Sequence, residues 1–366
     1  MGNEVNKLLV ALVLLMTVTL GGALYFKSQV GPSTTAEEAT PRLLKPNLPE
    51  KPSEPQVTYD DALQSITEEE LKEMLYHLAD YEKYKGRATG QPGNAAAAAW
   101  LKKQFESYGL PTMYDEFRTS RGNTKNVYAW IEGSEAPEEI IVLGAHFDHI
   151  SSSPGADDNA SGTVLVLETA EALAMLPREE IRRTIVFQLY SGEEMGLLGS
   201  RHYCANPKFP KKAPSMQKHV FMLNADMVGR LNSQQYLMLF DEKMDDVGQM
   251  VQDLSNKYPF ALSITRRGSG GSDQTPFLNK GVDVAWLFTG QHRDYHRPTD
   301  TADKIDYDGL EKITRYAYEL IYRVDHNKRH LCMWNTDYGD HMEKPTQHKA
   351  MFDHDNPNVP FPEPLE

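Results

Sequence analysis

Apolar segments alternate with amphipathic segments through the middle of this chain, and this alternation constrains the fold more than any other feature. The segments predicted as strands are 126–133, 139–149, 182–192, 219–227 and 283–288. The predicted helices between and after them are 161–176, 196–205, 243–258 and 310–327. Strands that are apolar throughout belong to a sheet covered on both faces. We therefore expect an α/β fold, a three-layer α/β/α sandwich whose sheet is mixed and mostly parallel.

Two helices are predicted ahead of this alternation. The first begins at a capping box, Thr67 followed by Glu70, and has apolar residues at helical spacing up to Tyr84. The second follows the loop RATGQPG, covers 94–109 and ends on Gly109. Ordered structure is therefore expected from about Tyr59 onward.

Composition sets limits on the partners of the protein. Of its 366 residues, 40% are hydrophobic and 25% are charged, as in ordinary globular proteins. The net charge of −14 argues against a nucleic-acid partner. Cys204 and Cys332 are too few for a disulfide framework, and one bridge or two free thiols both remain open.

The N-terminus carries an uncharged apolar run. Residues 8–26 contain no charge between Lys7 and Lys27, close to the roughly 20 residues that cross a bilayer. We predict an uncleaved membrane anchor within 1–30, with the catalytic domain outside the cytoplasm, periplasmic or extracellular. A cleaved signal peptide, which would make the protein secreted, is the alternative, since GGA at 21–23 offers small residues.

Three further segments follow this N-terminal one. Residues 31–57 are rich in Pro, Ser, Thr and Glu and are predicted to form a stiff, solvated linker. Residues 58–328 are predicted to form a single catalytic domain. Residues 329–366 are polar, with scattered Pro and His, and are expected to be a loosely ordered tail.

Ionisable side chains follow each predicted strand of the alternation from 139 onward. They are His146 and Asp148, then Asp157 and Asp158 in GADDNASG, then Glu193 and Glu194, Asp226, and His296. Each alone has an ordinary structural role, as a turn residue, a helix cap or a surface charge. Ligands of α/β sheets, however, bind beyond the carboxyl ends of the strands, where all these residues would meet.

So many carboxylates at one edge of a sheet would repel one another strongly without cations. Imidazoles and carboxylates without a thiolate suit zinc or another first-row divalent ion. Two imidazoles and three carboxylates serve two metals about 3.5–4 Å apart if one carboxylate bridges them. The sequence therefore predicts a metal centre.

Five motifs, in order and spacing, resemble one family of metallopeptidases: LGAHFDH, GADDNASG, SGEEMGLLGS, LNADMVGR and YHRPTDT. They are similar to the co-catalytic two-zinc aminopeptidases, a family that also contains glutamate carboxypeptidase II, the transferrin receptor and glutaminyl cyclase. The resemblance covers about residues 75–325. It implies two Zn²⁺ per chain, with Asp158 as the bridging carboxylate. His146 and Asp226 would complete one site, and Glu194 and His296 the other.

The resemblance also implies a reaction. Glu193 would be the general base as a hydroxide bridging the metals attacks the N-terminal peptide bond of a peptide with a free N-terminus. Asp148 would orient the imidazole of His146, and Tyr295 would hydrogen-bond the substrate oxyanion. The peptide bond Asp158–Asn159 would be cis. Two alternatives remain: a glutaminyl cyclase, which binds one zinc and performs acyl transfer, and a non-catalytic, receptor-like member without metals.

Several neighbouring residues are assigned ordinary roles. His149 is interpreted as a turn residue, Asp157 as a support for its loop, and His292 as a surface residue. Asp273 is not placed by the sequence. Met227, Phe277 and Phe288 are interpreted either as an apolar side-chain pocket or as core.

Overall fold

The computed structural model describes residues 56–208, 215–234, 236–240, 247–258, 261–265 and 271–327. The predicted anchor at 1–30, most of the linker at 31–57 and the tail at 329–366 lie outside the described residues, as does Cys332. Within the described residues, no helix has the length and apolar character needed to span a membrane. Cys204 is buried and is a free thiol.

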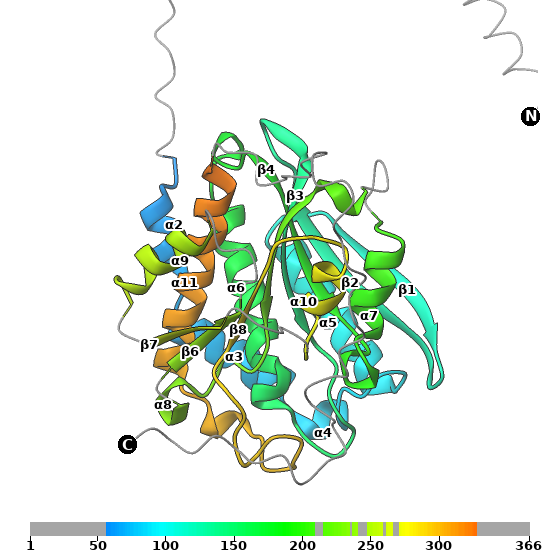
Figure 1. Ribbon diagram of the computed structural model, residues 1–366. Helices are drawn as coiled ribbons and strands as arrows, with labels where there is room; N and C mark the ends of the chain where they lie inside the picture. The colour runs from blue at the N-terminus through cyan, green and yellow to red at the C-terminus, as the bar shows by residue number, and fades with distance from the viewer. Residues whose placement is uncertain are drawn as a thin grey trace, which may run out of the picture. The chain divides into compact units, whose positions relative to one another are not determined.

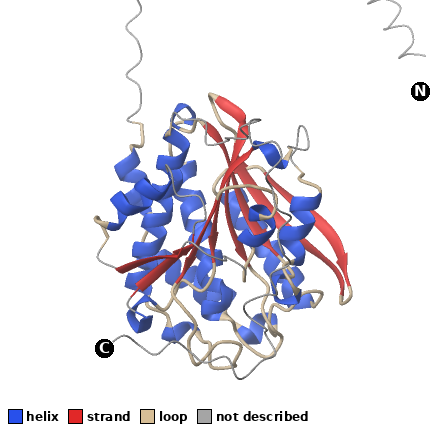
Figure 2. Cartoon of the chain, viewed as in Figure 1, coloured by secondary structure: helices blue, strands red, loops and turns tan. Residues whose placement is uncertain are grey.

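A mixed sheet forms the centre of the fold, and eight of its strands are described (Figures 1 and 2). Their spatial order is β1-β2-β4-β3-β5-β8-β6-β7. The strands β4, β3, β5 and β8 run parallel to one another, while β1, β2 and the β6–β8 pair add antiparallel contacts. The prediction of a mixed, mostly parallel sheet is confirmed. The strand bounds are β1 (Thr112–Thr119), β2 (Gly122–Ile131), β3 (Ala136–His146), β4 (Arg183–Tyr190), β5 (His219–Ala225), β6 (Tyr236–Phe240), β7 (Ala261–Thr265) and β8 (Val284–Phe288).

Both faces of the sheet are buried, as the apolar strands predict. On β3, Ile141 and Leu143 belong to the large core on one face, and Ile140 and Val142 belong to a smaller core on the other. Side chains of consecutive strand residues point to opposite faces, so one strand supplies both cores.

Helices cover the two faces unequally (Figure 1). The large core is packed by α2 (Tyr59–Ser65), α3 (Glu68–Leu78), α5 (Pro92–Ser107), α6 (Gly162–Ala174), α9 (Val247–Ser255) and α11 (Tyr307–His326). The smaller core is packed by α7 (Leu198–Ala205) and α10 (Gln274–Leu278). The short helices α4 (Tyr81–Tyr84), α8 (Leu231–Gln234), η1 (Ala156–Ser161), η2 (Arg178–Glu180), η3 (Glu193–Met195), η4 (Met216–Lys218) and η5 (Ala302–Lys304) lie in the connections. This arrangement is the predicted three-layer sandwich.

Local signals explain where the first helices begin and end. Thr67 accepts a hydrogen bond from the backbone N–H of Glu70 and caps α3, which confirms the predicted helix start. The predicted helix ends earlier than expected, at Leu78, because Asp80 caps the separate short helix α4. The predicted helix at 94–109 is α5, which begins at Pro92.

Three strands were not predicted from the sequence. TMYDEFRT forms the edge strand β1, which is largely unburied and therefore carries charged residues that hide a strand pattern. It pairs with β2 as an antiparallel hairpin. The strands β6 and β7 are five residues each, too short to show a period.

Candidate metal centre and active site

The strand ends bring the predicted site residues together. His146 is the last residue of β3, Asp226 directly follows β5, and the loop after β8 carries His296. Glu193 and Glu194 follow β4 in the short helix η3, which starts after Gly192 at a φ of 85°. Glycine adopts such a positive φ readily because it has no Cβ, so Gly192 allows the chain to turn at this edge of the sheet.

Asp158 lies at the middle of the site and faces two imidazoles. Its Oδ1 is 3.4 Å from Nε2 of His146, and its Oδ2 is 3.1 Å from Nε2 of His296. The carboxylate is almost completely buried. The two oxygens of one side chain thus point to two separate groups of side chains.

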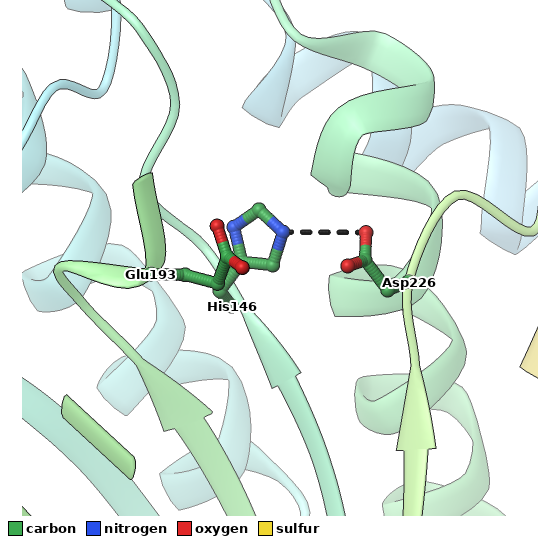
Figure 3. Close-up of side chains that lie close together, drawn as sticks. All are labelled: His146, Glu193 and Asp226. Atoms are coloured by element: carbon green, nitrogen blue, oxygen red, sulfur yellow. Dashed lines mark hydrogen bonds and ion pairs between the residues drawn. The ribbon is translucent and has the colours of Figure 1, made fainter. Parts of the chain in front are cut away.

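The first group consists of His146, Asp226 and Glu193 (Figure 3). Nε2 of His146 lies 3.3 Å from Oδ1 of Asp226, and the carboxylate of Glu193 lies beside the same ring. On the other side of the ring, Nδ1 is 3.1 Å from the backbone oxygen of Asp148. That contact fixes the ring so that Nε2 points into the site.

The second group lies around Glu194. Its Oε2 is 3.0 Å from Nε2 of His296, and its Oε1 is 3.1 Å from Nδ1 of His149. Together with Asp158, His149 and Glu194 bring three potential ligand atoms within 4.8 Å of one another. His149 is fully buried, so the interpretation of this residue as a turn residue is wrong.

Two residues of this second group, His149 and Glu194, have buried polar atoms without a hydrogen bond of ordinary geometry. Both ring nitrogens of His149 and Oε1 of Glu194 are buried and lack a hydrogen-bond partner. Buried polar atoms are nearly always paired, so such convergence needs a different explanation. His149, Asp158 and Glu194 converge at one buried place, as the ligands of a bound cation do. The His and carboxylate donors of the site fit zinc.

The pKa values of the adjacent glutamates Glu193 and Glu194 are shifted in opposite directions. Burial raises the pKa of Glu193 well above its ordinary value, although the His146 ring opposes this effect. Burial alone would also raise the pKa of Glu194, but the nearby His149 and His296 rings lower it below the ordinary value. Two carboxylates whose pKa values are driven apart are typical of residues with different roles in catalysis.

The imidazoles respond to the same carboxylates. Burial alone would lower the pKa of His296, but Asp158 and Glu194 outweigh it and raise the value to about 10. Burial is likewise outweighed at His146, whose pKa is raised well above its ordinary value by Asp226 and Glu193.

The sequence profile of peptidase family M28 matches residues 126–321, more than half of the chain. The chain belongs to peptidase family M28. The matched range contains all the predicted site residues.

Two curated relatives of this M28 chain are similar in sequence. It is 32% identical over 224 residues to leupeptin-inactivating enzyme 1 of Streptomyces exfoliatus, covering 60% of this chain and 47% of that one. It is 32% identical over 197 residues to aminopeptidase YwaD of Bacillus subtilis (strain 168), covering 50% of this chain and 41% of that one. The M28 chain thus spans less than half the length of these two relatives.

Solved structures share the fold. The aminopeptidase from Aneurinibacillus sp. strain AM-1 superposes with a TM-score of 0.63 at 16% identity, covering 73% of this chain and 96% of that one. Structures of glutaminyl cyclases match as well. Because the sequence identity to these structures is low, the comparison shows that they share the fold.

The loop of this M28 chain that carries Asp158 is held from several sides. Asp300 accepts hydrogen bonds from the backbone N–H groups of Asp157 and Asp158, at 3.0–3.1 Å. Oδ1 of Asp157 accepts from Gly229 N and from the Ser161 hydroxyl. Asp157 therefore supports its loop, as expected. The peptide bond Asp158–Asn159 is cis, as the resemblance implies.

Two supporting residues were not recognised in the sequence. Arg87 is fully buried and donates to four backbone oxygens, those of Leu78, Phe147, Pro154 and Gly155. His292 was predicted at the surface, but its Nε2 lies 2.9 Å from Oδ2 of Asp157 and its side chain is only 6% exposed. It ties the loop of His296 to that of Asp158. Neither carries a sequence signal, because each acts on a segment distant in the chain.

The remaining predicted residues lie around the site. Asp148 accepts from Glu193 N at 3.1 Å and from the Thr89 hydroxyl at 2.7 Å, so it joins β3 to the glutamates. The ring of Tyr295 stacks on His296 with 3.9 Å between centroids. Asp273 is fully buried and accepts from the Ser200 hydroxyl.

The three candidate apolar-pocket residues separate into two sets. Met227 and Phe288 form a small cluster with Trp286, against which Tyr295 packs. Phe277 instead packs among Tyr190 and Tyr203 in the smaller core, so it is a core residue.

Proposed function

We propose that this M28 chain is a zinc-dependent aminopeptidase that hydrolyses the N-terminal peptide bond of peptides with a free N-terminus. The observation that carries the proposal is the position of Asp158, whose two oxygens face His146 and His296. A carboxylate so placed fits a bridge between two metal sites. The aminopeptidase name of a similar M28 chain supports the reaction.

The proposal assigns two Zn²⁺ to these residues. His146, Asp226 and Asp158 would hold one ion, and His296, Glu194 and Asp158 the other. When bound, zinc ions polarise a carbonyl and lower the pKa of water toward 7. The Nδ1 atom of His149 lies 3.1 Å from Oε1 of Glu194, and we assign this third imidazole the role of positioning that carboxylate.

The chain's own residues would move the proton and stabilise charge. Glu193, which lies with His146 and Asp226 in the first group, would accept a proton from the attacking water and return it to the leaving amine. Tyr295, adjacent to His296, donates its phenolic O–H to the oxyanion. Asp148 holds the backbone N–H of Glu193 and so fixes the position of the base. The many carboxylates would favour a cationic α-amine in the site.

The proposal is tested by separating metal binding from proton transfer. Glu193→Gln should retain the zinc content of the wild type and lose about 100-fold to 10,000-fold in kcat on aminoacyl substrates. Glu194→Gln is the matched variant, since it changes the neighbouring carboxylate and should lose zinc. N-acetylated substrates should not be cleaved by any form. Near-normal turnover by Glu193→Gln, or cleavage of the blocked substrates, would contradict the proposal.

Analysis of the reaction products distinguishes an aminopeptidase from a glutaminyl cyclase, which has a similar fold. A peptide that starts with glutamine yields free glutamine on hydrolysis and a pyroglutamyl peptide on cyclisation. Mass spectrometry of the product separates the two reactions. A receptor-like member would bind no zinc and form neither product.

We also propose that residues 8–26 anchor the enzyme in a membrane with the domain outside the cytoplasm. Their uncharged apolar sequence supports this. The full chain should remain in the membrane pellet after carbonate extraction, and a chain that starts at residue 31 should not. Recovery of the full-length chain in the supernatant would contradict the anchor.

A further inference from the structure

A pocket lies among the helices that cover the large core, and no predicted site residue lines it. It has a volume of about 270 Å³. Four glutamates line it: Glu70 and Glu73 from α3, and Glu168 and Glu171 from α6. None of its lining residues is a lysine or an arginine. No basic side chain of the lining therefore offsets these carboxyl groups.

One of the four glutamates, Glu168, is buried, unlike a glutamate on an acidic surface. Its side chain is only 2% exposed. One carboxylate oxygen accepts a weak hydrogen bond from Thr67 N at 3.4 Å, and the other, Oε2, is buried without a hydrogen-bond partner. A buried carboxylate is unfavourable unless it is paired or neutralised. Burial and the adjacent Glu70 and Glu171 raise the pKa of Glu168 to about 9.

Aromatic and thioether side chains form the rest of the wall. The Trp100 ring stacks on His77 with 4.3 Å between centroids. The Tyr108 hydroxyl lies 3.6 Å from the sulfur of Met74. Aromatic surfaces combined with carboxylates recognise organic cations, through cation–π contact and burial of the carbon chain.

The spacing of the carboxylates argues against a metal ion in this pocket. A calcium ion takes six to eight oxygens at about 2.3–2.6 Å. Among the residues that the structure describes, only the two groups of the active site bring three ligand atoms within 4.8 Å. No three of the pocket glutamates bring ligand atoms that close together, so they suit a larger cation better than a compact one.

We propose that this pocket binds a primary ammonium group on an alkyl chain. Glu168 would pair with the ammonium, while Trp100 and Tyr108 would contact the methylene groups. A free aliphatic diamine and the lysine side chain of a polypeptide present this same chemistry. The pocket is independent of the proposed peptidase activity, because it shares no residue with that site.

Calorimetric titration of the zinc-loaded full chain tests the proposal. The probes are cadaverine, Nα-acetyl-lysine N-methylamide, the uncharged 1-pentanol and Ca²⁺. Cadaverine, the lysine derivative or both should bind, while pentanol and Ca²⁺ should not bind in the pocket. Cadaverine alone would identify a free amine as the ligand, and binding of the lysine derivative would identify a polypeptide side chain.

Three variants locate any binding. Glu168→Gln and Trp100→Leu should each weaken binding at least tenfold, and a circular dichroism spectrum confirms that each folds. Glu138→Gln is the control, since Glu138 is an exposed glutamate away from the pocket. Absence of amine binding in the wild type, unchanged binding in both pocket variants, or binding of Ca²⁺ that is lost in Glu168→Gln would overturn the proposal.

Discussion

At the scale of single residues, the site depends on pairs of neighbours that serve different partners. Glu193 and Glu194 are adjacent, yet Glu193 lies with His146 and Asp226, and Glu194 lies with His149 and Asp158. Asp157 and Asp158 repeat the pattern, since Asp157 is bonded to its own loop and Asp158 faces the two imidazoles. In each pair the two adjacent carboxylates point in different directions and contact different partners.

His149 provides a prediction at this scale. It is fully buried, and its Nδ1 lies 3.1 Å from Oε1 of Glu194. Because removal of such a supporting partner typically weakens metal binding 10-fold to 100-fold, His149→Ala should lose one of two zinc ions in dialysis against dilute chelator. Zinc content by mass spectrometry measures this directly. His326→Ala, at the end of α11, is the control and should keep wild-type zinc content. Equal retention in both variants would show that His149 has no part in the metal centre.

At the scale of elements, loops are placed by buried polar side chains, and Arg87 is the main example. It bonds the end of α3, through Leu78, to the loop between β3 and α6, through Phe147, Pro154 and Gly155. That loop carries Asp148 and His149. Hydrogen bonds of this kind hold the site residues in place although the carboxylates of the site repel one another.

Arg87→Met should therefore be strongly destabilising. The variant leaves three buried carbonyl oxygens and one partly buried carbonyl oxygen without their donor, and we expect the free energy of unfolding to fall by about 3 kcal/mol or more. Denaturant titration of the zinc-free protein measures the change. Arg118→Met, at an exposed position of β1, should lie within about 0.5 kcal/mol of the wild type. Similar unfolding midpoints for the two variants would exclude this role of Arg87.

Helix α6 yields a prediction of pH dependence through Glu168. Its pKa is raised from 4.5 to about 9 by burial and by Glu70 and Glu171. The unfolded chain ionises this group from about pH 4.5, whereas the folded chain holds the proton, so stability falls as the pH rises from 5 to 9. Without an added amine, the decrease due to Glu168 should be about 3 kcal/mol or more.

Unfolding of Glu168→Gln across the same pH range checks this expectation. The amide has no proton to lose, so the variant should be more stable than the wild type at pH 9 and nearly equal to it at pH 5. Glu138→Gln should keep the wild-type pH dependence. Parallel curves for the wild type and Glu168→Gln would mean that the carboxylate is not held protonated by the fold.

At the scale of the whole molecule, the parts predictable from sequence are those set by local pattern. The apolar runs that become β3, β4 and β5 place His146, Glu193 and Asp226 at one edge of the sheet, because parallel strands end on the same side. Asp158 and His296 follow from the same reasoning, since each lies in a loop at that edge.

Residues that depend on distant segments escaped this reasoning. His149 enters the site because the loop after β3 is folded back, with Gly155 at a φ of 60° against its ring and Arg87 bonded to the backbone oxygens. His292 contacts Asp157, 135 positions earlier. The edge strand β1 was missed for a different reason, because its exposed positions carry charge. Tertiary contacts, rather than local pattern, decide the positions of His149 and His292.

The most direct test of the two-zinc centre is X-ray diffraction from crystals of the protein, recorded above and below the zinc absorption edge. We predict two anomalous peaks per chain, one on each side of the Asp158 carboxylate. One peak should contact His146 and Asp226, and the other His296 and Glu194. A single peak, or none in crystals grown with zinc, would contradict the central claim that Asp158 bridges two metal ions.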